Sequence, residues 1–336
     1  MSWSFKIGTI FGIPIRIHLT FLLLLGYIAL KPEEGLSGAG FVGLIFICVV
    51  LHELGHSLVG RKFGADVASI TLLPIGGVAS MRNLPKSAKA EMFTAIAGPA
   101  VSVALGVIFL FLYKNMSKDF SLLLDLGGVN LFLAAFNLIP AFPMDGGRVL
   151  RAALWSRKGY SRATMIASKI GQVLAVACFI LALTTSNFML GLIALFIFFG
   201  ADTEKKAAVW NDAVESIPAW KAMQTNLKTL GSHQTIRDAF FLMKQSGQEN
   251  FPVVGENGLL GILTRIDLLR AIRDNRLDLP AADFMTKELV YCKHTDNLAD
   301  IIHLMDHKNL PCVIVMDQES IVGLITPEML QKVVVC

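Results

Sequence analysis

Charged residues are scarce in this chain of 336 residues: lysine, arginine, aspartate and glutamate make up only 17% of it, and 54% is hydrophobic. Soluble globular proteins seldom have so few charges. The composition therefore excludes an ordinary soluble protein over at least part of the chain. The formal net charge is only +4 and no block of like charges occurs. We therefore expect no nucleic-acid partner.

Cysteine is also rare, with five residues in the chain and no Cys-x-x-Cys spacing. A disulfide framework is therefore not expected, and the C-terminal part is expected to face a reducing compartment. A cleavable signal peptide is not evident either, because the first apolar run lacks a small-residue cleavage site. We expect that run to be a retained membrane span.

Long apolar runs fill residues 1–203, whereas charges are spread throughout residues 204–336. Six apolar segments can be counted, at about 17–30, 37–59, 91–112, 120–141, 165–184 and 187–202. A membrane-spanning helix needs roughly 20 apolar residues, and the first and the last two segments are near or below this length. Residues 1–203 are therefore predicted to form a multi-pass α-helical membrane domain of about six transmembrane helices.

The distribution of basic residues predicts the orientation in the lipid bilayer. If six spans cross the bilayer, most of the basic residues outside the spans, Lys86 among them, lie on one side of the membrane. The opposite side carries only Lys31, Lys114 and Lys118. Basic loops face the cytoplasm. We therefore expect an integral multi-pass cell membrane protein whose N-terminus and C-terminal tail are cytoplasmic.

His52, Glu53 and His56 lie inside the second apolar segment. On a helix, the spacing of four residues places both imidazoles on one face, where they can bind one Zn²⁺, and Glu53 can accept a proton from water. Placing ionisable residues at membrane depth costs free energy, so their presence indicates a function. The motif thus predicts a zinc site near the cytoplasmic end of the second span.

A catalytic zinc site has three protein ligands and an open position. Asp145 follows the fourth apolar segment at the same membrane side and is the natural third ligand. Pro140 and Pro143 should end the helix before it, because proline removes a backbone donor. Gly146 and Gly147 should allow a sharp turn directly after Asp145.

This constellation resembles the site-2 protease family of intramembrane zinc metalloproteases. The resemblance is carried by residues 12–18, 52–56 and 137–146. It implies one zinc held by His52, His56 and Asp145, with Glu53 as general base. It also implies that Asn137 binds the substrate or the developing oxyanion. One residue departs from the family pattern, since Ser102 stands where the family often has Asn.

In this resemblance the substrate is a transmembrane protein segment, cleaved in regulated intramembrane proteolysis. The loop over residues 60–90 contains short apolar stretches around a Gly-Gly pair, which predict a β-hairpin. In the family such a segment can pair with an unwound substrate as an added strand. Gly76, Gly77 and Val78 are then candidate substrate-binding residues. A plain hairpin at the membrane interface remains the alternative.

The tail contains one pattern twice, at about 222–275 and 284–336, after a linker at 204–221. Each copy alternates amphipathic helices with short apolar strands, which predicts a soluble α/β domain built from two units. The repeat resembles a tandem cystathionine-β-synthase (CBS) domain pair. That resemblance implies an adenine nucleotide bound by Thr264 and Asp267. The second copy has Met329 in place of Asp, and a purely structural or dimerising pair is the alternative.

Two other functions stay open from the residues alone. The histidines could belong to a membrane metal transporter or metal sensor that its CBS pair regulates, although residues 17–202 show no internal repeat of the kind that transporters have. An inactive scaffold is the third possibility, and the complete set of ligands argues against it. We therefore expect a zinc metalloendopeptidase, with nucleotide regulation as a further hypothesis.

Overall fold

The computed structural model describes residues 3–329 except 32–34, 83–86, 117–120, 216, 257, 309, 318, 319 and 328. The chain divides into two compact units, Met1–Ala208 and Val209–Cys336. Lys86, Lys118 and residues 330–336 of the second predicted repeat lie outside the described residues.

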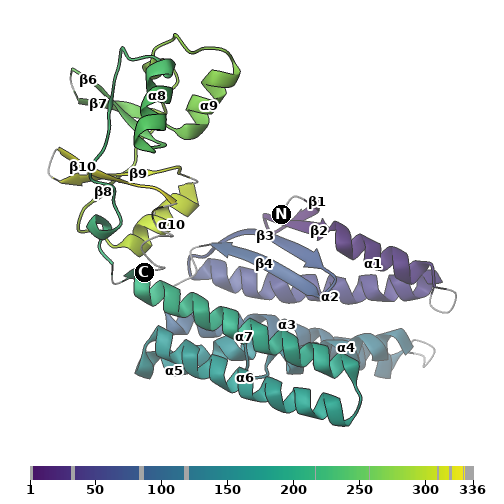
Figure 1. Cartoon of the computed structure of the whole chain (residues 1–336). Coiled ribbons are helices and arrows are strands. Elements are labelled where there is room, and N and C mark those ends of the chain that lie inside the picture. Colours follow the sequence, from purple (N-terminus) through teal and green to yellow (C-terminus); the bar gives the residue numbers. More distant parts are fainter. Residues whose placement is uncertain are drawn as a thin grey trace. The chain divides into compact units, whose positions relative to one another are not determined.

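The first unit consists of helices and one small sheet (Figure 1). Its elements in chain order are β1 (Ser4–Ile10), β2 (Ile13–His18), α1 (Leu19–Ala29), α2 (Gly35–Lys62), β3 (Asp66–Leu73), β4 (Gly76–Arg82), α3 (Ala88–Asn115), α4 (Ser121–Asn137), α5 (Asp145–Lys158), α6 (Tyr160–Thr184) and α7 (Phe188–Glu215). The last helix continues across the boundary into the second unit.

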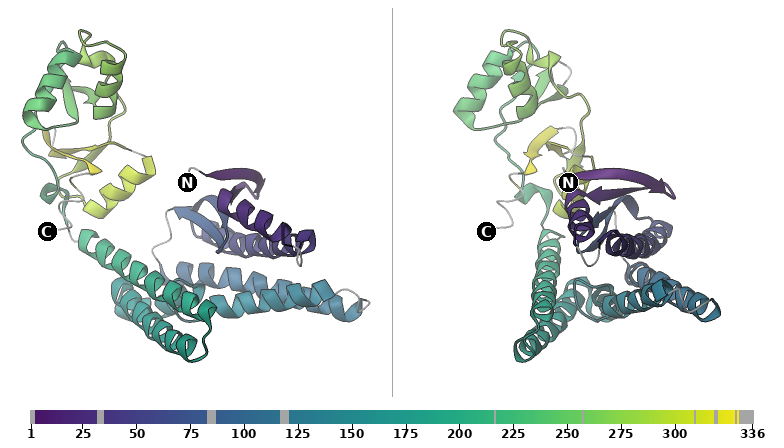
Figure 2. Two further views of the ribbon diagram at one scale, coloured as in Figure 1. Left: turned by 45° about the vertical axis from the view of Figure 1, so that its right-hand side comes forward. Right: turned by 90° about the vertical axis from the view of Figure 1, so that its right-hand side faces the viewer.

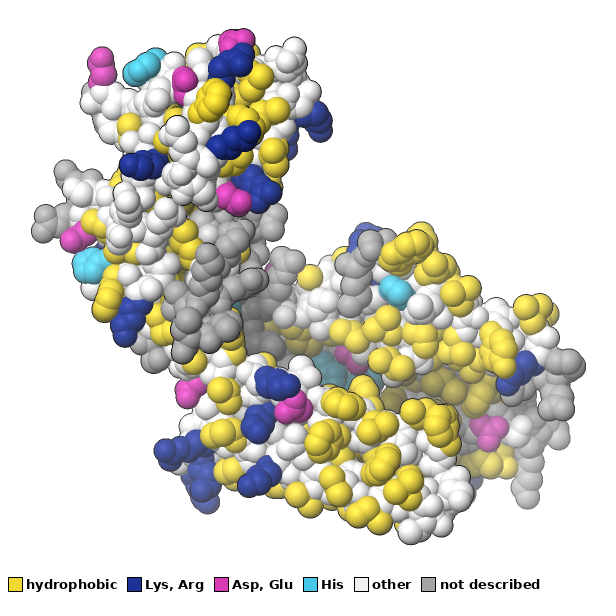
Figure 3. Space-filling view, viewed as in Figure 1, with side chains coloured by type: hydrophobic (Ala, Val, Ile, Leu, Met, Phe, Trp, Pro, Cys, Tyr) yellow, Lys and Arg dark blue, Asp and Glu magenta, His cyan; other side chains and the backbone are white. Residues whose placement is uncertain are grey.

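Within the described residues, three helices are long and apolar enough to cross a membrane: α2, α3 and α6. Helices α1 and α4 are apolar but shorter. Many large hydrophobic side chains are exposed on this unit, including Phe111, Phe132 and Leu183. Figure 3 shows hydrophobic side chains spread over much of the visible surface of these helices. A surface of this kind is suited to contact with lipid tails rather than water.

The predicted helix break before Asp145 is confirmed, since α4 ends at Asn137 and α5 begins at Asp145. The predicted sharp turn at Gly146 and Gly147 is wrong, because both residues belong to α5. Glycine is required there for a different reason. A Cβ at Gly146 would collide with the carbonyl oxygens of Leu138 and Ile139. The loop therefore packs directly on the first turn of α5.

The sheet has the strand order β1-β2-β3-β4. Strands β3 and β4 are antiparallel, which confirms the predicted hairpin. Strand β2 pairs in parallel with β3, and α1 and α2 lie between them in the sequence. The sheet lies along α2, as both figures of the ribbon show (Figures 1 and 2). Apolar residues of β2, β3, α1 and α2 form the core between them. Strand β4 is left at one edge of the sheet.

The second unit contains the same arrangement twice. The first copy has η1 (Ala219–Lys221), β5 (Leu230–Gly231), α8 (Ile236–Ser246), β6 (Phe251–Gly255), β7 (Gly258–Leu263) and α9 (Arg265–Arg273). The second has η2 (Ala281–Asp283), β8 (Tyr291–Lys293), α10 (Leu298–Lys308), β9 (Val313–Asp317) and β10 (Ser320–Ile325). In both, the first strand pairs in parallel with the middle one and the last strand is antiparallel.

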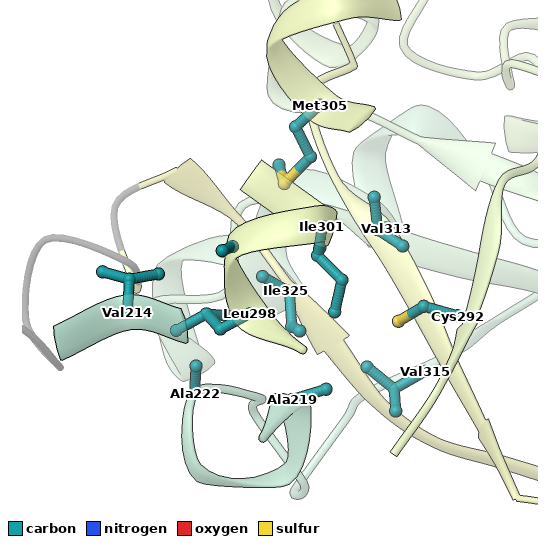
Figure 4. Close-up of a cluster of buried hydrophobic side chains, with 11 residues drawn as sticks. Val214, Ala219, Ala222, Cys292, Leu298, Ile301, Met305, Val313, Val315 and Ile325 are labelled. Carbon is teal, nitrogen blue, oxygen red and sulfur yellow. The ribbon is translucent and has the colours of Figure 1, made fainter. Parts of the chain in front are cut away.

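Each copy completes the sheet of the other. Thr286, at the start of the second copy, exchanges two backbone hydrogen bonds with Ile262 of β7, and Gln224 does the same with Leu324 of β10. Side chains repeat the exchange, because Met285 packs over Gly261 and Met223 packs over Gly323. Figure 4 shows the core of the second copy, to which Val214 at the end of α7 contributes.

Candidate metal centre

Two histidines on one face of α2 form the centre of the site. His52 and His56 are one helical turn apart and almost fully buried, with 4% and 7% of their surface exposed. Their Nε2 atoms are 3.1 Å apart. The spacing of four residues in the sequence therefore brings both ring nitrogens to one point, as the motif predicted.

Asp145 reaches the same point from the start of α5. Its Oδ2 lies 3.3 Å from His52 Nε2 and 3.1 Å from His56 Nε2. Asp145 is also the first residue of α5, where a negative side chain is stabilised by the positive end of the helix dipole. Within the described residues, this is the one group of three or more potential metal ligands that lie together.

Helix α3 fixes the orientation of both imidazoles. His56 Nδ1 lies 2.7 Å from the carbonyl oxygen of Thr94, and His52 Nδ1 lies 2.8 Å from Ser102 Oγ. A carbonyl oxygen can only accept, so His56 must donate from Nδ1 and leave Nε2 free as a ligand. Partners of this kind hold metal-binding histidines in place. Ser102, the departure from the family pattern, thus has a structural role beside His52.

The three ligand atoms fit a zinc ion. Zinc binds imidazole nitrogen and carboxylate oxygen at about 2.0–2.1 Å in a tetrahedron, whose corners are then about 3.3–3.4 Å apart. The three distances between His52, His56 and Asp145 are 3.1–3.3 Å. Two imidazoles and one carboxylate also match the three-ligand donor set of catalytic zinc sites. The residues present could therefore hold zinc and leave a fourth position open.

The histidines control the charge of Asp145. Burial alone would raise the pKa of this carboxyl group, but the adjacent imidazoles of His52 and His56 outweigh burial and hold the pKa below its usual range. Asp145 is therefore a carboxylate at neutral pH, the form that a metal requires.

Glu53 lies next to the ligands and to the edge of the sheet. Its side chain is close enough to His52, His56 and Asp145 to interact with them electrostatically. A Cβ at Gly77 would lie only 2.7 Å from Glu53 Cγ, so β4 passes directly over this side chain. Gly76 and Val78 flank that position on β4. The predicted base and the predicted substrate-binding strand are thus neighbours.

Asn137 is the last residue of α4, and its Nδ2 donates to the Leu133 carbonyl oxygen at 3.0 Å. That bond uses one of the two amide hydrogens.

Three contributors to the site were given no role by reasoning from the sequence. They are Thr94 and Ser102, which bind the histidines, and Gly98, where any Cβ would collide with His56 and lie 2.7 Å from His52 Nε2. All three lie on α3 at spacings of four residues, so they share one face. That pattern was the available signal, but nothing local connects it to residues that lie about 40 to 50 positions earlier.

Thr264 and Asp267 lie in the second unit, at the start of α9. Thr264 Oγ1 donates to Asp267 Oδ2 at 2.6 Å and accepts from the Asp267 backbone N–H. Together they form a capping box, which satisfies free backbone groups of the helix. Thr235 and Asp238 form the same box at the start of α8.

Comparison with known proteins identifies both parts of the chain. The model of peptidase family M50 matches residues 40–123 and 116–178, and the CBS domain model matches residues 214–274 and 281–335. The CBS domain-containing protein YhcV of Bacillus subtilis is 33% identical over 31% of this chain and 75% of its own length.

Similarity to one relative extends over nearly the whole length. The zinc metalloprotease MJ0392 of Methanocaldococcus jannaschii is 35% identical over 97% of this chain and 94% of its own. A solved structure of a site-2 protease from M. jannaschii is 42% identical, covers 60% of this chain and 95% of its own, and has a TM-score of 0.49. The chain is therefore a zinc metalloendopeptidase of peptidase family M50, the site-2 protease family, and it carries a CBS domain pair.

Proposed function

We propose that the protein is an intramembrane zinc endopeptidase that cleaves transmembrane segments of other proteins, in regulated intramembrane proteolysis. The observation that carries this proposal is the meeting of His52, His56 and Asp145 within 4.8 Å of one another, at the end of a long apolar helix. His52, His56 and Asp145 would hold one zinc ion per chain. Glu53 would act as the general base.

Further features support a location in the membrane. Six helices would cross or enter the bilayer: α2, α3 and α6, the shorter α1 and α4, and the apolar first half of α7. The exposed hydrophobic side chains of these helices would then face lipid. The excess of basic residues on one side would place the N-terminus and the CBS pair in the cytoplasm. On this basis, the domains would be residues 1–203 and 222–336, joined by 204–221.

Zinc, when bound, would acidify a water molecule and polarise the scissile carbonyl. Side chains of the protein would transfer the proton, stabilise the oxyanion and orient the imidazoles. A Glu53 carboxylate oxygen would take the proton of the attacking water and deliver it to the leaving amine nitrogen. The second N–H of the Asn137 amide would stabilise the developing oxyanion. Ser102 and Thr94 would keep the imidazoles in one orientation throughout.

The edge of the sheet would bind the substrate. A peptide inside an intact helix hides its carbonyl groups, so the substrate must be unwound locally before attack. Strand β4 has β3 on one side, and within the described residues no strand pairs with its other side. An extended substrate could add there as a further strand. Gly77 has no side chain, so such a strand would run close to Glu53.

Metal analysis tests the assignment of the ligands. We expect the purified protein to contain one zinc per chain and Asp145→Ala to bind zinc at least about 100-fold more weakly, because removal of one of three ligands leaves an incomplete site. Elemental analysis after gel filtration measures this, and Asp125→Ala is the matched control. Full zinc retention in Asp145→Ala would exclude Asp145 as a zinc ligand.

The CBS pair would bind an adenine nucleotide and regulate the peptidase. Thr264 would contact phosphate and Asp267 the ribose hydroxyls, as the family resemblance implies. Regulation requires that the nucleotide bind two states of the protein with different affinity. A homodimer through the CBS pair is part of the same proposal.

The two capping boxes of this copy allow a role in nucleotide binding to be tested separately from a role in helix capping. Asp267→Asn and Asp238→Asn each weaken one box in the same copy, and such losses reduce stability by about 0.5–2 kcal/mol. We expect only Asp267→Asn to weaken the binding of ATP, ADP or AMP, by about tenfold, since one charge-assisted hydrogen bond contributes about 1.5–3 kcal/mol. Calorimetric titration of the full-length protein measures the affinity. Equal affinity in the two variants would exclude Asp267 as a nucleotide ligand.

A further inference from the structure

Arg151 is a buried charge on the helix that begins with Asp145, and the proposed reaction does not use it. It lies on α5, six residues after Asp145, and only 6% of its surface is exposed. Its Nε lies 2.7 Å from Glu91 Oε1 on α3, and its Nη1 lies 3.0 Å from Glu204 Oε2 on α7. One guanidinium group thus joins three helices.

The same guanidinium group also contacts the loop that carries Asp145. Its Cζ lies 4.9 Å from the centre of the Phe142 ring and 4.8 Å from the centre of the Tyr160 ring. Phe142 is fully buried and precedes Asp145 by three residues. A guanidinium group at this distance attracts the face of an aromatic ring, more strongly where water is absent. Arg151 therefore connects the ion pairs to the loop.

One face of α7 forms the other boundary of this loop. Ile197, Gly200, Ala201 and Glu204 follow the spacing i, i+3, i+4, i+7, so they lie on one side of the helix. Ile197 packs with Ala141 and Met144, and Ala201 packs with Phe142.

Gly200 marks the closest approach. A Cβ added there would lie 2.6 Å from Cδ of Pro143, in the middle of the loop. The loop cannot move toward α7, and α7 cannot approach further, without a steric clash.

We propose that Arg151 and this face of α7 are positioning elements that hold Asp145 within bonding distance of the metal. The proposal rests on the proposed function, because it requires Asp145 to be a zinc ligand. Asp145 is the first residue of α5 and directly follows a seven-residue loop without regular structure. Packing from α7 and the Arg151 network hold this loop in place.

The chemistry of the network favours a role in position over a role in stability. A buried ion-pair network usually stabilises a fold no better than apolar residues of the same size. Burial acts to lower the pKa of Arg151, but Glu91, Tyr160 and Glu204 outweigh burial and raise it. The guanidinium group is therefore charged at every working pH.

Two glycine substitutions on α7 test the proposal. In Gly200→Ala, the added Cβ must displace Pro143, whereas in Gly191→Ala the nearest atom is Ala182 Cβ at an ordinary 3.7 Å. Supporting partners of metal ligands typically contribute 10–100-fold to metal affinity or activity. We expect Gly200→Ala to weaken zinc binding and to lower kcat by that factor, with KM unchanged. Gly191→Ala should match the unaltered protein in both.

Zinc affinity is measured by competition with a chelator, and the visible spectrum of the cobalt-loaded protein reports ligand geometry without any turnover. Arg151→Lys and Arg151→Met provide the second test. Lysine keeps the charge but lacks the planar group that reaches both carboxylates. Arg151→Lys should therefore be more active than Arg151→Met but less active than the unaltered protein. If Arg151→Met fails to fold, Gly200→Ala decides.

The outcomes distinguish this proposal from the one on which it rests. If the unaltered protein binds zinc through Asp145 but Gly200→Ala keeps its affinity, kcat and cobalt spectrum, the positioning role is excluded and the proposed function stands. If Asp145→Ala retains zinc, the proposed function itself fails.

Discussion

Replacement of Glu53 by glutamine is expected to stop cleavage of the substrate while the metal stays bound. Glutamine has nearly the same shape, so the side chain should still fit beneath Gly77 of β4. It cannot accept a proton from water, and a general base contributes about 10²–10⁴-fold to the rate. Cleavage of a single-span substrate in reconstituted membranes, followed under single-turnover conditions, should therefore fall by at least about 100-fold.

The interpretation depends on the metal content of the variant. Zinc in Glu53→Gln should remain at one equivalent per chain, because Glu53 is not among the three ligands that lie together. Glu288→Gln, at an exposed position of the CBS pair, should cleave at the normal rate. Undiminished cleavage by Glu53→Gln would exclude Glu53 as the base, and loss of zinc would show instead that it binds the metal.

The second large effect is expected from a single methyl group at Gly98. Any Cβ at this position of α3 would collide with His56 Nε2 and lie 2.7 Å from His52 Nε2, the two nitrogens that would bind zinc. Either the imidazoles rotate away or α3 moves from α2. Both changes separate the ligands, so we expect Gly98→Ala to lose zinc by at least about 100-fold in affinity and to lose all measurable cleavage.

Two glycines of α2 serve as comparisons, because they separate a loss of the ligand geometry from a general loss of stability. Gly55→Ala would place a Cβ 2.8 Å from the Ala97 carbonyl oxygen, which disturbs the packing of α2 on α3. Gly43→Ala would meet nothing within 4 Å. Overpacking typically reduces stability by about 1–3 kcal/mol, so Gly55→Ala should lower the melting temperature yet hold zinc more tightly than Gly98→Ala. Stoichiometric zinc in Gly98→Ala would contradict the geometry of the site.

The cluster of His52, His56 and Asp145 was predictable from the sequence because its pattern is largely local. His52 and His56 are set by helical spacing, and Asp145 followed from the requirement that a third ligand lie at the same end of a span. The β3–β4 hairpin was likewise predicted, because two short apolar stretches flank one turn. The family itself was predicted from these motifs and is confirmed.

The features that were missed depend on contacts between distant segments. Strand β1 is mostly exposed, so it has no clear alternation of buried residues, and β2 pairs with β3 across two intervening helices. Helix α5 was not predicted, because Gly146 and Gly147 favour a turn when considered alone. Only the close packing of the loop on α5 shows why glycine is needed within a helix there.

In the tail, the repeat was visible but the exchange between its copies was not. Met223 and Met285 lie at the starts of the two copies, and each packs on a glycine of the opposite copy. Sequence comparison of one copy with the other cannot distinguish two adjacent units from two units that complete each other.

That exchange has a consequence for how the tail can respond to a ligand. Since Thr286 closes the sheet that contains β7, and Gln224 closes the sheet that contains β10, neither half has a finished hydrogen-bonded edge in isolation. The halves should therefore melt in a single transition. A small molecule bound to one half would also stabilise the other half through the backbone hydrogen bonds that they share. The two halves of the tail would then respond together rather than separately.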